Sequence, residues 1–185
     1  MAGEILVGND AIDRVSTPGI SEATWVDREH SATLNGKLKL IKVYSPSPII
    51  NVRAASFYVV SGNNLSTRDW VTIGSVPSGY SEHVVDFNIE VGDYLGLCGT
   101  SDGPNGSLDV STNGSLGAWR TAGLHIPATN YAFTLYSNWV LSMQGIGDIL
   151  VGGPAIAVLT GVLSGSINTV NNIAWSEIAK INGVG

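Results

Sequence analysis

The sequence predicts an all-β protein, an antiparallel two-sheet sandwich of the jelly-roll kind with an extended C-terminal tail of low charge. Three observations favour this fold class. Glycine is abundant, with 23 copies in 185 residues, and turn dipeptides recur along the chain. The segments between these turns are short and rich in β-prone residues. Before residue 170 almost no segment has the apolar period of a helix, so crossovers between parallel strands are not expected.

The expected strands follow one another with turn signals about every 8–12 residues, the spacing typical of sandwiches. They are residues 5–7, 23–27, 38–43, 51–60, 70–76, 85–91, 94–98, 108–110, 118–121, 131–136 and 139–144. Asn35-Gly36 predicts a hairpin turn, because both residues accept the positive φ of a type I′ turn. Within residues 38–43 the apolar positions change from even to odd numbers, which predicts a β-bulge near Leu40.

Two of these segments carry the clearest patterns. Residues 51–60 form the most β-prone run of the chain, and we expect them at the centre of a sheet. In residues 85–91 four apolar residues alternate with three polar ones. This period of two indicates a strand with one buried face and one face in water.

The chain carries little charge for a soluble domain. Charged residues make up 13% and hydrophobic residues 44%, whereas a usual domain has about 25% charged residues. Part of the surface is therefore expected to be covered by something other than water. The net charge is −6, and the densest basic group is Lys37, Lys39 and Lys42. Strict alternation would place Lys42 on the face opposite the other two, so no basic patch forms and we expect no nucleic-acid partner.

The last part of the chain has a composition of its own. From residue 121 onward only Asp148, Glu177 and Lys180 are charged, and residues 149–176 carry no charge. We therefore divide the chain into a β-sandwich domain, residues 1–145, and an assembly tail, residues 146–185. The expected assembly residues are the large apolar ones: Ile149, Leu150, Val151, Ile156, Val158, Leu159, Val162, Leu163, Trp175, Ile178 and Ile181.

The tail allows two interpretations. It covers a sheet of its own domain, as docked tails commonly do, or it docks on a neighbouring subunit by adding a strand to an exposed sheet edge. Exposing so many apolar side chains would cost many kcal/mol, at about 25 cal/mol per Å². Trp175, Ile178 and Ile181 are spaced by three, which predicts a short helical turn that Asn182-Gly183 would end.

The sequence predicts neither export nor membrane insertion. The first residues lack the basic and apolar regions of a signal peptide, so we expect synthesis in the cytoplasm of the producing cell and use without Sec export. The longest apolar run, residues 149–163, is interrupted by glycines and a proline. It is shorter than the roughly 20 residues of a spanning helix, and no membrane partner is expected.

No pattern in the sequence points to catalysis, a metal or a cofactor. Cys98 lies in an apolar run and is expected to be a buried, unreactive thiol. The three histidines occur in no metal or catalytic motif, and no GxSxG or phosphate-binding loop is present. We therefore expect a protein that is not an enzyme.

Three acidic or aromatic features keep a functional alternative open. Asp86, Glu90 and Asp93 are close enough in sequence to form a carboxylate pair of the glycosidase kind, although solvated charges are expected on such a strand face. The turn at residues 102–109 offers oxygen ligands for calcium without the EF-hand spacing. Of the five tryptophans, Trp70 is the one expected to be exposed and able to stack on a sugar.

Several short segments carry a family resemblance. In order along the chain they are residues 11–14 (AIDR), 25–27 (WVD), 54–58 (AASFY), 66–69 (STRD) and 91–97 (VGDYLGL). Together they resemble a group of β-sandwich sequences common in phage and environmental genomes. The ending at residues 178–184 (IAKINGV) resembles short motifs near the ends of tailed-bacteriophage virion proteins. The resemblance implies a virion component, such as a capsid decoration protein, a head fibre or a tail-fibre domain.

Three functional hypotheses follow. The first is a non-enzymatic virion structural protein that assembles with its own subunits, with a trimer compatible with either role, and with partners such as the major capsid protein. The second is a carbohydrate- or receptor-binding module that contacts a host surface glycan through Trp70. The third is a self-polymerising surface filament that exchanges donor strands through its tail.

Overall fold

Antiparallel strands make up most of the described part of the chain, which contains no helix. The computed structural model describes residues 4–14, 22–102, 108–149, 169–170 and 173–174. A four-stranded sheet has the order β1 (Glu4–Gly8), β13 (Met143–Ile149), β3 (Gly36–Ser45) and β6 (Gly79–Ile89). A seven-stranded sheet has the order β10 (Tyr131–Ala132), β5 (Asn64–Val76), β4 (Ile49–Ser61), β7 (Tyr94–Ser101), β2 (Glu22–Asp27), β9 (Ala118–Ala122) and β11 (Thr134–Tyr136). The short pair β8 (Val110–Ser111) and β12 (Val140–Leu141) forms a third sheet.

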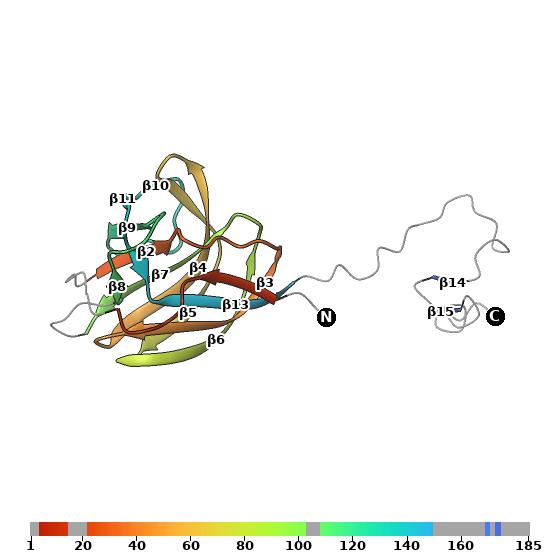
Figure 1. The fold of residues 1–185 in the computed structure, drawn as a ribbon, viewed down its shortest axis with the longest axis horizontal. Helices are drawn as coiled ribbons and strands as arrows, with labels where there is room; N and C mark the ends of the chain where they lie inside the picture. Colours follow the sequence, from red (N-terminus) through yellow and green to blue (C-terminus); the bar gives the residue numbers. More distant parts are fainter. Residues whose placement is uncertain (1–3, 15–21, 103–107, 150–168, 171–172, 175–185) are drawn as a thin grey trace. The chain divides into compact units, whose positions relative to one another are not determined.

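Eight of the strands, β1 to β7 and β13, pair in jelly-roll order, and Figure 1 shows their arrangement. The first pairs with the last, β1 with β13; β2 pairs with β7, β3 with β6 and β4 with β5. All four pairs are antiparallel, as in a long hairpin rolled into two sheets. The expected two-sheet antiparallel sandwich is thus confirmed, and residues 51–60 lie in the interior strand β4 as expected.

The main core lies between the two sheets and is built from the inward residues of both. Trp25 of β2 and Phe87 of β6 are its largest members, each 1% exposed. The expected alternation in residues 85–91 holds through Ile89, where β6 ends, and Val91 lies exposed in the following turn. Each inward side chain removes apolar area from water, which is the main contribution to the stability of such a sandwich.

A second core fills the other side of the seven-stranded sheet, which curls until its two edges nearly meet. Strands β10 and β11, separated only by Phe133, are the two edge strands of this sheet and pair with β5 and β9 respectively. Asn63, in the turn between β4 and β5, accepts hydrogen bonds from Trp119 Nε1 of β9 and from Phe133 N, both 2.9 Å. The curl encloses Phe57, whose ring packs edge-on against Phe133 at 5.9 Å.

The predicted β-bulge is present at Lys39. Leu38 and Leu40 pair with Phe87 and Val84 on β6 but with the adjacent Gly147 and Ile146 on β13, so the register of β3 shifts against both neighbours. Glycine is required at position 147, because a Cβ there would lie 2.1 Å from the Lys37 carbonyl oxygen. Relative to β13, strand β3 thus has one extra residue at Lys39. A bulge of this kind bends the strand locally and increases its twist.

The bulge also corrects one expectation. Ile41 and Val43 are buried, and Lys42 therefore points outward, on the same face as Lys37 and Lys39. The prediction of opposite faces assumed strict alternation, which the extra residue at the bulge interrupts. Lys42 pairs across the strands with Glu82, at 3.9 Å.

Two further expectations differ from the structure in their boundaries. Residues 131–136 were expected to form one strand but form two, at opposite edges of the curled sheet. The first compact unit ends at Leu150, five residues beyond the expected boundary, because β13 continues to Ile149 between β1 and β3. The second unit, residues 151–185, contains the described antiparallel pair β14 (Thr169–Val170) and β15 (Ile173–Ala174). The expected helical turn at residues 175–181 lies outside the described residues.

Candidate interaction face and polar pocket

A row of four apolar side chains crosses the outer face of the four-stranded sheet. The strand registers align Leu6 of β1 with Ile146 of β13, Ile146 with Leu40 of β3, and Leu40 with Val84 of β6. Leu6 is 50% exposed and Val84 is 90% exposed, while Ile146 and Leu40 are half-buried. We call this row the apolar row. Aligned apolar side chains that face water mark interaction sites more often than scattered ones do.

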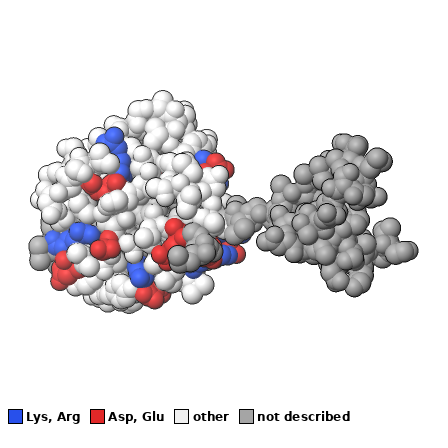
Figure 2. Space-filling view, turned by 45° about the vertical axis from the view of Figure 1, so that its right-hand side comes forward, with Lys and Arg blue, Asp and Glu red and all other residues white. Residues whose placement is uncertain are grey.

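Polar side chains border the apolar row on both sides. On one side the registers align Glu4, Asp148, Lys37 and Asn88. Lys37 and Lys39 both reach Asp86, at 3.0 and 3.1 Å. On the other side lie Gln144 and the Lys42–Glu82 pair. Figure 2 shows a surface on which small mixed groups of acidic and basic side chains are separated by broad uncharged areas.

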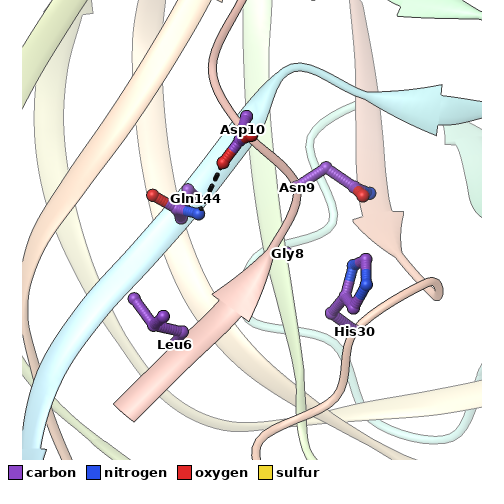
Figure 3. A pocket seen from close by; sticks show the side chains of 6 residues that line it. All are labelled: Leu6, Gly8, Asn9, Asp10, His30 and Gln144. Carbon is purple, nitrogen blue, oxygen red and sulfur yellow. Dashed lines mark hydrogen bonds between the residues drawn. The ribbon is translucent and has the colours of Figure 1, made fainter. Parts of the chain in front are cut away.

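A polar pocket of about 300 Å³ lies where β1 ends, next to the apolar row (Figure 3). Its lining residues are Leu6, Gly8, Asn9, Asp10, His30 and Gln144. Gln144 Nε2 donates to Asp10 Oδ1 at 3.1 Å, and Gly8 N donates to the His30 carbonyl oxygen at 2.9 Å. The pocket therefore combines a carboxylate, two amides and an imidazole with one apolar wall. Such a set can bind a small polar molecule through several hydrogen bonds.

A buried carboxylate, Asp27, supports the wall of this pocket. The residue is 0% exposed, and its Oδ2 accepts a hydrogen bond of 2.6 Å from Asn9 Nδ2. Its Oδ1 accepts from the backbone N–H of Glu29 at 2.9 Å and of His30 at 3.4 Å. Burial raises the pKa of Asp27 to about 6, because desolvation outweighs these hydrogen bonds. Asp27 thus holds both Asn9 and the turn that carries His30.

The carboxylates that suggested a glycosidase pair are engaged in ion pairs. Asp86 binds two lysines, whose hydrogen bonds lower its pKa. Arg68 binds the other two: its Nε lies 2.6 Å from Asp93 Oδ2, its Nη2 lies 3.1 Å from Asp93 Oδ1, and its Nη1 lies 3.0 Å from Glu90 Oε2. Asp93 is 1% exposed. In this arrangement Glu90 and Asp93 anchor the turn between β6 and β7.

Trp70 is 40% exposed on β5, as the sequence predicts, with the Arg53 guanidinium 5.3 Å from its ring centroid. Trp25 and Trp119 are buried in strands, as expected, and Trp139 lies just outside a strand and stacks on Tyr136 at 4.1 Å. Cys98 is buried, which raises the pKa of its thiol. In the described part of the chain no three His, Cys, Asp or Glu side chains are grouped as a metal site would require.

The predicted assembly residues fall into two groups. Ile149 belongs to β13, where it packs against the main core, so it is part of the sandwich and not of the tail. This difference arises because pairing with β1 and β3 carries the strand past the boundary that composition suggested. The others lie outside the described residues: Leu150, Val151, Ile156, Val158, Leu159, Val162, Leu163, Trp175, Ile178 and Ile181.

Sequence reasoning missed the apolar row and the pocket. Leu6 and Ile146 are 140 positions apart, and only the antiparallel pairing of the first and last long strands aligns them. The one available signal was an apolar residue on the polar face of an alternating strand, as at Val84.

No protein-family model matches the chain, and no curated protein matches it. Among the residues that are described, the structure has no long apolar helix of the kind that crosses a membrane.

Proposed function

We propose that this protein is a non-enzymatic virion structural protein, of the capsid decoration or fibre kind, that assembles with copies of itself. The observation that carries the proposal is the apolar row, exposed on the sheet whose strand β13 leads directly into the uncharged residues 149–176. A particle component needs such surfaces, because it functions through contacts with neighbouring subunits.

The fold and the resemblance agree with this proposal. Double-sheet jelly rolls with the strand pairing found here build many viral capsid domains, and also lectins. A fold alone does not assign a function, but the low charge and the apolar row fit a protein that is partly covered in its working state. In a symmetric array many weak contacts gain strength through effective concentration. Copies of the chain and other particle proteins, such as the major capsid protein, are the proposed partners.

The tail is the second proposed contact, and charge placed in it should reveal its role. In the full chain, the double substitution Val158→Asp and Leu163→Asp is expected to weaken self-association at least tenfold, because carboxylates cannot be buried in an apolar interface without a large penalty. Analytical ultracentrifugation measures this effect, and Ser164→Asp with Ser166→Asp is the matched control. A lower unfolding temperature with unchanged association would contradict the proposal, since it would mean that the tail covers its own domain.

The same experiment separates this proposal from the filament hypothesis. A capsid or fibre component forms a closed oligomer of defined mass, whereas donor-strand exchange between identical copies continues without limit. Mass photometry of the wild-type chain distinguishes the two, and open-ended growth would favour the filament.

The polar pocket favours a second candidate function, the binding of a hydroxylated ligand such as a host-surface glycan. Carboxylate and amide groups of the kind supplied by Asp10 and Gln144 bind sugar hydroxyls. If the pocket is the site, Asp10→Asn is expected to weaken glycan binding about tenfold, the loss of one charged hydrogen bond, and Trp70→Ala to leave it unchanged. A glycan array followed by titration calorimetry measures both variants. The reverse pattern would assign the site to the exposed Trp70 ring. A wild-type chain that binds no glycan would exclude this function.

A further inference from the structure

The apolar row matches itself under a two-fold rotation. Consider an axis that runs parallel to the strands, above the midline between β13 and β3. Rotation by 180° about this axis places β1 of one copy over β6 of the other and β13 over β3. The position of each residue along the strand direction does not change. Leu6 then faces Val84 of the second copy, and Ile146 faces Leu40 of the second copy. Sheets packed face to face in this way lie about 10 Å apart, so their side chains interdigitate.

The charges beside the apolar row are complementary under the same rotation. On the border of the row that includes Glu4 and Lys37, the β1–β13 half of the face carries two carboxylates, Glu4 and Asp148. The β3–β6 half carries two ammonium groups, Lys37 and Lys39, with the single carboxylate of Asp86 between them. The rotation lays the acidic half of each copy over the basic half of the other.

The opposite border of the row adds no repulsion. Lys42 and Glu82 neutralise one another there, and the Gln144 side chain beside them carries no charge. The apolar row and both of its borders are therefore compatible with one and the same rotation, which is the requirement for an isologous contact.

We infer that the outer face of the four-stranded sheet binds the same face of a second copy of this chain about this two-fold axis. The inference rests on the proposed assembly function and names its partner and its geometry. Four strands spaced by about 4.8 Å make a face about 20 Å wide, and the seven residues of β13, at about 3.4 Å each, make it about 24 Å long. The face therefore offers roughly 500 Å², less than the roughly 800 Å² that each partner contributes to a standard interface. The pair is therefore weak and concentration-dependent in dilute solution, and it gains strength in an array where other contacts hold the copies together.

Two charge variants of the full chain test the inference. Asp148→Lys makes the β1–β13 half neutral, so neither copy offers an acidic half to the basic half of the other. Lys39→Glu makes both halves acidic, so like charges face each other. Each variant alone is expected to self-associate about tenfold more weakly than wild type, since every reversed charge acts twice across a two-fold interface. An equimolar mixture is expected to regain association, because a basic face then meets an acidic one. Fluorescence-detected sedimentation, with one variant labelled, measures the mixed pair.

The controls separate this contact from other effects. Glu22→Lys makes the same charge change on β2 of the other sheet and should leave association unchanged. Val84→Asp should abolish association without lowering the unfolding temperature, because that side chain is 90% exposed. If the mixture associates no better than the separate variants, the face-to-face contact is wrong. Loss of assembly in the tail variants with no effect of the face variants would overturn this inference alone, and a wild-type chain that stays monomeric at all concentrations would overturn the assembly function as well.

Discussion

Replacement of Arg68 by alanine is expected to lower the free energy of unfolding by about 3 kcal/mol. The substitution leaves the Asp93 carboxylate, 1% exposed, without its bidentate partner. Loss of one partner of a buried ion pair costs roughly 3–5 kcal/mol, and the lower figure applies because the Arg68 side chain is itself 29% exposed. Urea denaturation followed by tryptophan fluorescence measures the change.

A matched control separates this effect from the loss of a surface charge. Lys42 is exposed to a similar degree, 28%, but its partner Glu82 is itself 48% exposed. Lys42→Ala should therefore change the free energy of unfolding by less than about 0.5 kcal/mol. A double-mutant cycle with Asp93→Ala isolates the pair, and simple addition of the two single effects would contradict the assigned coupling.

The substitution Asp27→Asn is expected to remove a pH dependence of stability worth about 3 kcal/mol. The carboxyl has a pKa of about 6 in the folded protein and near 3.8 in the unfolded chain. Between these values the folded state binds the proton and the unfolded state does not, so Asp27 makes the wild type less stable as the pH rises from about 4 to 6. A difference of about two pKa values corresponds to about 3 kcal/mol.

Denaturant titrations at pH 4, 5 and 7 check this sign. The free energy of unfolding of Asp27→Asn relative to wild type should increase with pH over that range. Asp86→Asn serves as the opposite control: the hydrogen bonds from its two lysines lower its pKa, so Asp86 contributes stability that is lost as the pH falls through its folded-state pKa. Equal pH profiles for Asp27→Asn and wild type would show that the carboxyl titrates normally and is not buried as described.

The Asp27 effect also bears on the polar pocket. Asn9 lines the pocket and donates its shortest hydrogen bond to Asp27. Protonation of Asp27 near pH 6 weakens this charge-assisted hydrogen bond. A ligand of the pocket would therefore bind with an affinity that changes around pH 6, at the upper end of the range in which Asp27 makes stability depend on pH.

The local features of this fold could be predicted from the sequence because each depends on neighbouring residues. Alternation in residues 85–91 indicated which side chains of β6 face the core, and the change from even to odd apolar positions located the bulge beside Leu40. The run at residues 51–60 lies in the interior strand β4, and its segment 54–57 is buried on both faces, whereas residues 58–60 are exposed. Composition was a weaker guide: it ended the sandwich at residue 145, and strand pairing extends the compact unit to Leu150.

By itself the sequence determined the fold class, the main strands and the uncharged segment at residues 149–176, because these follow from periods of two and from local composition. Only the tertiary structure decided which strands are neighbours. The apolar row needs Leu6 beside Ile146, and the buried ion pair needs Arg68 beside Asp93. These contacts join residues far apart in the chain. Their register is set by the packing of whole sheets and the closure of long loops, and no short stretch of sequence contains that information.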